Sequence, residues 1–356
     1  MITLNTEMFK DAVGKAIKGA GLNKLIPLTS MIAIKVENNQ LTLITTDASN
    51  TLYIMREVNA STFYAVAYAE QLYKLITRIT TDTIKLDVKD AVLIVKANGE
   101  YKLELPLDEN GNTVVFPEDD LSSIQTVAPN TDISLATVKT ILETNKVALA
   151  TTAEEPCYMN YYVGDKVVST DREKMCGLDI SIFDDAKLIS AQTMDLLDVM
   201  TDEKISVYID NSKITFATKN CILVSNEAEG VDEYAIDVIN TLLDEEFASN
   251  CKVNKSALIA LLERIALFVG PYDKNAITLT FTEDGIDISS KQSSGIESIK
   301  YIESNEFKPY TCEVAIDTFL SQVKANASDT VLIQYGNERS IKLVDDKITQ
   351  VIALLM

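Results

Sequence analysis

The sequence predicts an α+β protein built from three repeats of one unit, each with two amphipathic helices on one face of antiparallel sheets. Residues 163–183, VGDKVVSTDREKMCGLDISIF, have the pattern of two strands joined at a polar turn, and residues 40–54 and 285–302 repeat it. In each repeat a helix and a strand precede this hairpin, and a second helix with further strands follows it. Because a recurring pattern indicates recurring structural units, we expect three domains with these bounds: 1–124, 125–248 and 249–356.

The first repeat begins with a short strand near Thr3 and a helix over 6–21. In this helix Phe9, Val13 and Ala16 fall on one side, as in a helix that buries one face. The other elements predicted here are strands at 31–36, 41–45, 51–56 and 63–67, a helix over 68–79, and strands at 83–88, 91–97 and 100–106.

The second and third repeats follow the same order. Residues 108–132, rich in Pro, Gly, Asn, Asp and Ser, predict a linker with one short strand before the second repeat, and residues 240–250 predict a connection to the third. The second repeat is predicted to have helices over 134–148 and 191–200, with strands at 157–162, 166–169, 177–182, 205–209, 213–217 and 221–226. The third is predicted to have helices over 254–268 and 315–324, with strands at 276–281, 285–289, 295–302, 331–335, 340–344 and 349–354.

The composition offers no known catalytic constellation. The chain has 356 residues, 47% of them hydrophobic, which suits two or three domains with their own cores. It contains no histidine, the commonest general base and zinc ligand, and none of the motifs GxxxxGKS/T, GxGxxG, GxSxG or DxDxDG. Carboxylates and lysines can still perform acid–base chemistry, so an enzyme stays open as a distant alternative. We predict no catalytic residues, no metal site and no cofactor.

The remaining features predict a cytoplasmic protein. No apolar run approaches the roughly 20 residues of a membrane span, and the N-terminus lacks a signal-peptide pattern. Five cysteines, odd in number and without CxxC spacing, are interpreted as reduced thiols: Cys157, Cys176, Cys221, Cys251 and Cys312.

The charge of the chain is distributed unevenly. A net charge of −21 argues against wrapping nucleic acid by charge neutralisation. The first predicted helix of every repeat is nevertheless net basic. Solvated lysines explain any one such helix, but the recurrence over three repeats favours a shared basic surface. The candidates for that surface are Lys10, Lys15, Lys18, Lys24, Lys74, Arg78, Lys139, Lys146 and Arg264.

Over its whole length the sequence resembles the β subunit of bacterial DNA polymerase III, the β sliding clamp. The resemblance is carried by the three-repeat order and by these short segments: Leu25-Ile26-Pro27-Leu28, Thr46-Asp47, Phe116-Pro117, Ser169-Thr170-Asp171, Leu242–Phe247 and the apolar terminal Met356. It implies a DNA-clamp fold and a head-to-tail homodimer closed into a ring, with helices lining the hole. Such a ring encircles duplex DNA independently of sequence and tethers the replicative polymerase for processive synthesis. Lys24 then lies near a DNA-contacting basic residue of the family.

The resemblance also implies two protein-binding surfaces. Ring closure through edge strands places Tyr101 and Leu103 opposite Phe268 and Val269, although all four are equally consistent with ordinary core residues. The polymerase and the clamp loader insert short peptides into a pocket whose matching positions are Met159, Thr170, Arg172, Lys174, Met175, Ser340, Ile352, Leu354 and Met356.

Departures from the family pattern leave the peptide preference open. Arg172-Glu173 replaces the family's Gly-His, Ala353 replaces a proline near the terminus, and Leu355 replaces a basic residue. These departures suggest a divergent clamp and leave open whether a phage or mobile element or the host encodes it. The alternative is an acidic, clamp-like interaction protein or DNA mimic that does not encircle DNA. The aspartates Asp47 and Asp171 are interpreted as turn-capping carboxylates rather than metal ligands.

Overall fold

A computed structural model describes residues 1–21, 25–152, 154–210, 212–270, 272, 275–290 and 295–355, with the backbone alone for Ser123 and Gln125. Its internal contacts divide the chain into two compact units, Met1–Val138 with Gln192–Glu227 and Lys139–Ala191 with Ala228–Met356. The division falls within the second predicted repeat, in helix α4 (Leu135–Thr144) and at the start of helix α5 (Ala191–Leu197). The three-domain organisation stays a prediction.

The first unit contains two antiparallel sheets. Its strands are β1 (Ile2–Asn5), β2 (Met31–Glu37), β3 (Gln40–Thr46), β4 (Asn50–Glu57), β5 (Phe63–Tyr68), β6 (Thr83–Lys89), β7 (Val92–Lys96), β8 (Glu100–Glu104), β9 (Thr131–Ser134), β14 (Lys204–Asp210), β15 (Lys213–Ala217) and β16 (Cys221–Asn226). Four strands form the order β1-β6-β7-β8, and eight form the order β5-β2-β3-β4-β16-β15-β14-β9. The pairing of β4 with β16 joins the first predicted repeat to the second within one sheet.

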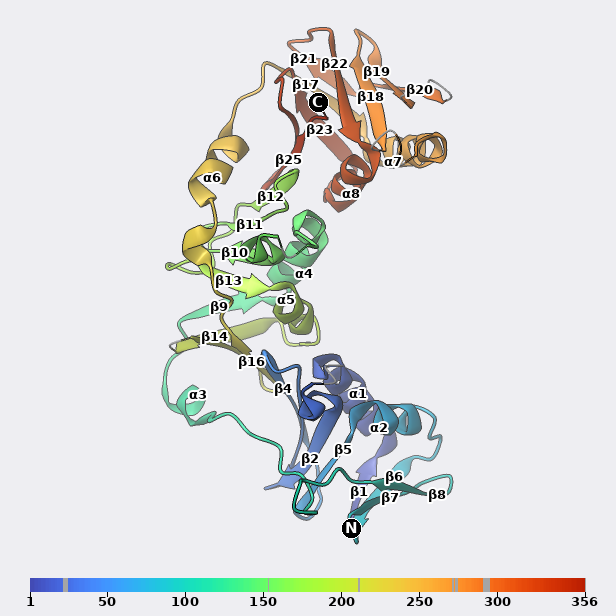
Figure 1. The fold of residues 1–356 in the computed structure, drawn as a ribbon, viewed down its shortest axis with the longest axis vertical. Coiled ribbons are helices and arrows are strands. Elements are labelled where there is room, and N and C mark those ends of the chain that lie inside the picture. Colours follow the sequence, from blue (N-terminus) through green and yellow to red (C-terminus); the bar gives the residue numbers. More distant parts are fainter. Residues whose placement is uncertain are drawn as a thin grey trace. The chain divides into compact units, whose positions relative to one another are not determined.

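Helix α1 (Thr6–Ala16) forms where the sequence supplies both a cap and an apolar face. The side chain of Asn5 accepts a hydrogen bond from the Met8 backbone N–H at 2.9 Å, which satisfies one of the orphan donors of the first turn. Phe9 and Val13 are fully buried. The helix packs on β1, β3 and β4 and against α2 (Ala69–Ile76), and Figure 1 shows both helices on the same side of the larger sheet.

The second unit repeats this plan with a longer sheet. Its strands are β10 (Asn160–Val163), β11 (Val167–Thr170), β12 (Lys174–Leu178), β13 (Lys187–Ser190), β17 (Ser249–Asn254), β18 (Ala276–Phe281), β19 (Gly285–Ser290), β20 (Ile296–Lys300), β21 (Glu303–Asn305), β22 (Tyr310–Ala315), β23 (Thr330–Tyr335), β24 (Ser340–Asp345) and β25 (Ile348–Ala353). Nine strands form the order β13-β10-β11-β12-β25-β24-β23-β17-β21, and four form the order β20-β19-β18-β22. Here β12 pairs with β25, so the second and third predicted repeats also share a sheet.

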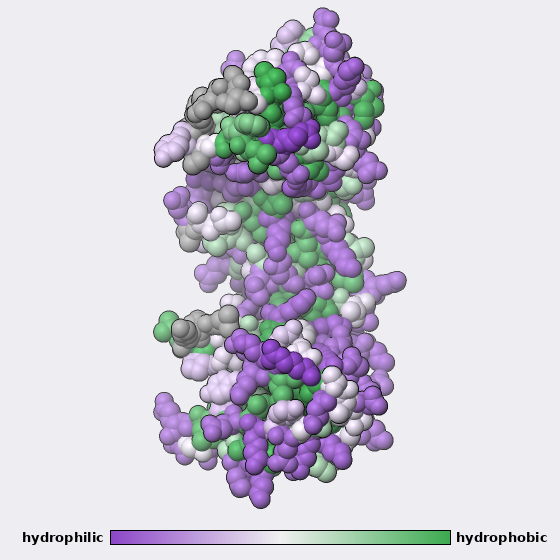
Figure 2. Space-filling model, turned by 90° about the vertical axis from the view of Figure 1, so that its right-hand side faces the viewer, coloured by the Kyte–Doolittle hydropathy of each residue, from purple (hydrophilic) through white to green (hydrophobic). Residues whose placement is uncertain are grey.

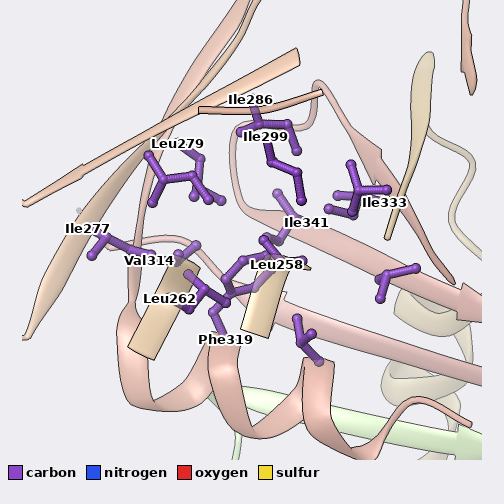
Figure 3. Packing of buried hydrophobic residues seen from close by; sticks show 14 of the residues in the cluster. Leu258, Leu262, Ile277, Leu279, Ile286, Ile299, Val314, Phe319, Ile333 and Ile341 are labelled. Carbon is purple, nitrogen blue, oxygen red and sulfur yellow. The ribbon is translucent and has the colours of Figure 1, made fainter. Parts of the chain in front are cut away.

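Helices α7 (Lys255–Ile265) and α8 (Ile316–Ala325) contact each other beside these sheets and supply the core of the second unit. Figure 3 shows Leu258, Leu262 and Phe319 of these helices directed at apolar side chains of the strands. Ile333 and Ile341 complete the core from the longer sheet, and both are fully buried. Both predicted helices therefore bury the apolar stripe that their spacing indicated.

The hairpin turn on which the repeat was recognised has the same geometry in two repeats. Thr46 Oγ1 donates to the Asn50 carbonyl at 2.6 Å, and Thr170 Oγ1 donates to the Lys174 carbonyl at 2.8 Å. Asp47 Oδ1 accepts two backbone N–H bonds at 2.9 and 2.7 Å, and the matching atom of Asp171 accepts two at 3.0 and 2.9 Å. These contacts show the turn-capping role expected of both aspartates.

Several elements differ from the sequence-based expectation. Residues 240–244 of the expected connection 240–250 belong to helix α6 (Ile236–Asp244), and the linker contains the short helix α3 (Ser122–Thr126). Some predicted α-helices end in single 3-10 turns: η1 (Ile17–Gly19), η3 (Lys146–Ala148) and η6 (Ala266–Phe268). Further 3-10 turns precede strands, η2 (Pro27–Ser30) and η4 (Pro156–Met159), and η5 (Val231–Glu233) precedes helix α6. Helix α6 was missed because the acidic run after Leu243 indicates a solvated connection when read locally.

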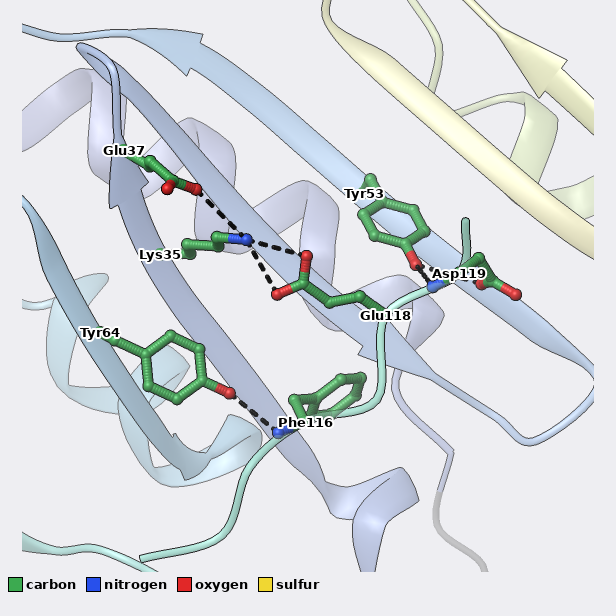
Figure 4. A network of polar contacts seen from close by, with 7 residues as sticks. All are labelled: Lys35, Glu37, Tyr53, Tyr64, Phe116, Glu118 and Asp119. Carbon is green, nitrogen blue, oxygen red and sulfur yellow. Dashed lines mark hydrogen bonds and ion pairs between the residues drawn. The ribbon is translucent and has the colours of Figure 1, made fainter. Parts of the chain in front are cut away.

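The linker of the first unit is fixed to the larger sheet by polar contacts. Figure 4 shows Lys35 between Glu118 and Glu37, with Nζ–Oε2 distances of 2.9 and 3.5 Å. The hydrogen bond with Glu118 raises the pKa of Lys35. The Tyr53 hydroxyl accepts from the Asp119 backbone N–H at 2.7 Å and burial raises its pKa. The linker is therefore held on the face of the sheet opposite α1 and α2.

Candidate functional site

Four neighbouring strands of the second unit, β11, β12, β25 and β24, form a sheet face that carries three predicted pocket residues. Thr170 lies opposite Met175, Met175 opposite Val351, and Ser340 opposite Ala353 in the β11–β12, β12–β25 and β24–β25 ladders. Directly paired residues share a face because side chains alternate along a strand. We call this surface the outer face, and its members are Thr170, Met175, Ser340, Val351 and Ala353.

The other predicted pocket residues lie apart from this face. Ile352 is fully buried in the core on the opposite side of β25, and Leu354 packs against the same core. Met159 is half-buried at the end of η4, and Met356 lies outside the described residues. Val351 and Ala353 lie on the outer face instead, because neighbouring residues of a strand point to opposite faces.

Charged residues at the β11–β12 turn surround one end of the outer face. Lys174 Nζ lies 2.7 Å from Asp171, and exposed Arg172 lies 2.6 Å from Glu155. Arg172 has a φ of 78°, in the left-handed region that favours glycine. Arg172 therefore adopts a backbone conformation that suits the glycine found at this position in the family pattern.

Helix α6 covers much of the outer face. Its side chains Ile239 and Leu243, 4% and 6% exposed, form one buried cluster with Met175 and Val351. Figure 1 shows α6 on the side of this sheet opposite α8. Hollows lie at both ends of α6: a groove of about 940 Å³ lined by Tyr162 and Ile236 among others, and a smaller one of about 350 Å³ lined by Phe247 and Lys342 among others.

Many of the basic residues predicted to face DNA are paired with neighbouring carboxylates. The shortest distances between the paired atoms are Lys10–Glu7 2.8 Å, Lys15–Asp11 3.2 Å, Lys74–Glu70 2.6 Å and Arg264–Glu297 2.6 Å. Lys18, Arg78, Lys139 and Lys146 are exposed, and Lys24 lies outside the described residues. The paired helix faces therefore present less positive charge than a count of lysines and arginines suggests.

The pKa shifts of the acidic partners agree with this pairing. Burial alone raises the pKa of Asp11, but hydrogen bonds from Arg56 and Lys15 outweigh it and leave that pKa below its usual value. The hydrogen bonds from Arg264 lower the pKa of Glu297. These carboxylates thus stay ionised at neutral pH.

The strand expected at a subunit boundary forms the edge of a sheet, and a second edge strand lies in the other unit. Strand β8 ends the four-stranded sheet of the first unit, with Tyr101 36% exposed and Leu103 6% exposed. Strand β20 ends the four-stranded sheet of the second unit. An uncovered strand edge offers unpaired N–H and C=O groups to another chain.

An apolar patch accompanies the edge at β20. Phe268 is 52% exposed, and Leu267 and Ile296, which the sequence did not single out, are 80% and 67% exposed. Figure 2 shows a green patch in its upper part, where Figure 1 places α7 and β20. Val269 is half-buried and packs against the core. The patch therefore extends the predicted boundary from Phe268 to Leu267 and Ile296.

The described residues contain neither a candidate metal site nor a candidate membrane span. No group of three or more Cys, Asp or Glu side chains in this part of the chain is placed to hold a metal ion. Across the same residues, no helix has the length and apolar character of a membrane span. All five cysteines are free thiols and buried, and burial raises the pKa of Cys176 to about 12.

Comparison with solved structures identifies the fold. The β subunit of a DNA polymerase from Streptococcus pyogenes superposes with a TM-score of 0.87 at 18% identity, covering 99% of each chain. The DNA polymerase sliding clamp of Bacillus subtilis gives 0.84 at 15% identity over 100% of this chain and 98% of that one. The β subunit of DNA polymerase III from Thermotoga maritima gives 0.83 at 13% identity over 100% and 99%. No protein-family model and no curated protein sequence matches the chain.

The chain therefore has the sliding-clamp fold over its whole length, with mixed helices and antiparallel sheets, and this confirms the fold predicted from the sequence.

Proposed function

We propose that this protein is a sliding clamp: a head-to-tail homodimer that encircles duplex DNA and tethers a DNA polymerase for processive synthesis. The observation that carries the proposal is the superposition of the entire chain on proteins described as DNA polymerase sliding clamps. In this role the protein is an accessory factor of the polymerase without catalytic activity of its own, and it acts in the cytoplasm.

The charge distribution supports encirclement rather than tight binding. When a protein binds DNA phosphates through lysine and arginine, its affinity for DNA falls steeply as the salt concentration rises. Here Lys10, Lys15, Lys74 and Arg264 are neutralised by carboxylates of the same chain. A ring with such an inner surface would stay on DNA through topological linkage and slide with little resistance.

The two sheet edges support closure of the ring. In a head-to-tail dimer, β8 of one chain would pair with β20 of the other, and the same contact would recur at the second boundary. The exposed Phe268, Leu267 and Ile296 would be buried there. Two identical contacts would close the assembly.

The assembly state provides the first test. Light scattering after size-exclusion chromatography should give twice the mass of one chain. Ile296→Asp should shift the protein toward the monomer, because it places a charge in the proposed boundary. Val127→Asp is the matched control: Val127 is 61% exposed and belongs to the linker rather than to β8 or β20, so this variant should stay dimeric.

Encirclement is tested on circular DNA. Protein diluted to favour monomers is mixed with nicked plasmid, concentrated, and passed through a sizing column at high salt. The proposal requires retention on the circle and release after one restriction cut. A monomer that is not retained on circles would reject the proposal and favour a clamp-like protein that does not encircle DNA.

We further propose that a polymerase and a clamp loader dock on the outer face through short peptides. The support is the convergence of Thr170, Met175 and Ser340 on that face, together with its apolar members.

A further inference from the structure

The apolar part of the outer face is already occupied by a segment of the same chain. Helix α6 directs Ile239 and Leu243, one helical turn apart, onto Met175 and Val351. Gly177 on β12 leaves room for this contact, because a Cβ there would lie 2.7 Å from Leu243 Cδ1. A partner protein could bind this part of the sheet only after α6 had left it.

One lysine holds the C-terminal end of α6 to the sheet. Lys342 Nζ donates to the Leu243 carbonyl at 2.8 Å and to the Glu245 carbonyl, and it lies 5.2 Å from the centre of the Phe247 ring. The last carbonyls of a helix have no partner within the helix and carry its negative end. Lys342, 4% exposed, supplies both hydrogen bonds and positive charge at that end.

Helix α6 is weakly supported by its own sequence. It has nine residues, and its N-cap, Ala235, makes no side-chain cap hydrogen bond. Isolated helices of this length are marginal in water. Asp244, Glu245 and Glu246 at its C-terminal end oppose the helix dipole. Packing of Ile239 and Leu243 on the sheet and the hydrogen bonds from Lys342 therefore stabilise a helix that would not be stable in isolation.

We propose that α6 is an exchangeable occupant of the outer face, and that partners dock by displacing it. The fitting partner is an amphipathic segment with two large apolar side chains one helical turn apart, followed by carbonyl or carboxylate oxygens for Lys342. This inference rests on the proposed docking function of the outer face. Docking is then a competition between a tethered helix and a segment of another protein.

The probe is a fluorescent peptide with the sequence of residues 234–247, YAIDVINTLLDEEF. Fluorescence anisotropy measures its binding to the full-length protein. The wild-type chain should bind it weakly, since its own α6 holds the site. The double variant Ile239→Asp with Leu243→Asp should bind at least tenfold more tightly. A peptide carrying the same two aspartates should bind neither protein.

A matched control lies on the same helix. Val238 is 61% exposed on α6, so Val238→Asp introduces the same charge without unseating the helix and should bind the peptide as weakly as the wild type. Leu243→Asp alone removes one of the two apolar contacts of the tethered helix and leaves the sheet and Lys342 unchanged, so it should give an intermediate gain in peptide affinity. Circular dichroism confirms that each variant is folded.

Peptide affinity equal to that of the wild type in both the double variant and Leu243→Asp would overturn the proposal and make α6 a fixed part of the core. Should the double variant fail to fold, Leu243→Asp decides. Hydrogen exchange of the wild type gives an independent readout: α6 amides should exchange at least tenfold faster than those of β25, and equal protection would also reject the proposal. If the protein is retained on circular DNA but α6 is not displaced by the peptide, this inference alone is rejected and the proposed function stays in place.

Discussion

Arg172 shows how one residue can oppose the local backbone. Its φ of 78° is expensive for an L-residue with a long side chain, whereas glycine adopts it readily. The ion pair with Glu155 offsets little of this, because the Arg172 side chain is 67% exposed.

Arg172→Gly should therefore raise the free energy of unfolding by about 0.5–1 kcal/mol, after the larger entropy of glycine in the unfolded chain is counted. Urea denaturation measures it. The neighbouring Glu173→Gly is the control, because Glu173 has a negative φ, and it should lower stability instead. A loss of stability in Arg172→Gly would show that the arginine side chain contributes more than the turn geometry costs.

Lys342 makes the free energy of unfolding depend on pH, and the burial of its side chain sets the sign of that dependence. Burial lowers the pKa of Lys342, while the nearby charges of Glu245 and Asp244 raise it by less. The folded chain thus binds this proton less tightly than the unfolded chain, whose lysine titrates near its usual pKa of about 10.4. Folding is favoured as pH rises from the lowered pKa to the ordinary one.

The stability of the wild type relative to Lys342→Met should therefore increase between pH 8 and pH 10. Urea melts of both proteins at each pH give this difference, in which the other titrating groups cancel. A relative stability that falls over this range would mean that the folded protein holds the proton more tightly than the unfolded chain does.

Among the elements, β25 and α8 enclose polar groups that lack partners. Gln350 and Gln322 are fully buried, and neither their amide nitrogen nor their amide oxygen has a hydrogen-bond partner among the described residues. A buried polar group without a partner is destabilising by about 1–3 kcal/mol.

Gln350→Met conserves the size of the side chain and removes the unpaired amide, so it should raise the unfolding free energy by about 1 kcal/mol. Thermal and urea unfolding measure the change. The control is Gln334→Met on β23, because Gln334 is only partly buried and should respond little. A marked destabilisation in Gln350→Met would show that the amide is satisfied by ordered water.

The helices and strands also show which features of the fold can be predicted from the sequence. Helical spacing around Phe9 and Leu258 located α1 and α7, because a helix that buries one face leaves a local pattern. The joining of β4 to β16 left no such pattern, since it depends on pairing between segments far apart in the chain. Of the residues predicted for a peptide pocket, Thr170 and Met175 lie on the outer face, whereas Ile352 lies on the opposite face of β25, because neighbouring residues of a strand point to opposite faces. The pocket itself stays a prediction.

At the scale of the whole molecule, we expect the intrachain ion pairs to restrain the proposed interaction with DNA. Each phosphate contact made by a released lysine should add about 0.9 to the slope of log affinity against log salt. Glu7→Gln with Glu70→Gln would release Lys10 and Lys74 from their partners.

This double variant should bind a short linear duplex more tightly than the wild type, with a slope steeper by up to about 2. Fluorescence anisotropy at several salt concentrations measures both quantities. The control, Glu57→Gln with Glu100→Gln, changes the net charge equally without releasing a residue predicted to face DNA. Equal effects of the two double variants would point to net charge alone and count against a DNA-facing role for α1 and α2.

The pairing of β4 with β16 has a consequence for the continuity of the polypeptide. Because backbone hydrogen bonds, and not the exposed segment 108–112, join the flanking portions of this sheet, the covalent link there is dispensable for holding them. Residues 1–110 and 111–356 made as separate polypeptides should then find each other and copurify. New termini, and with them tags or fused domains, would be tolerated at this point of the chain.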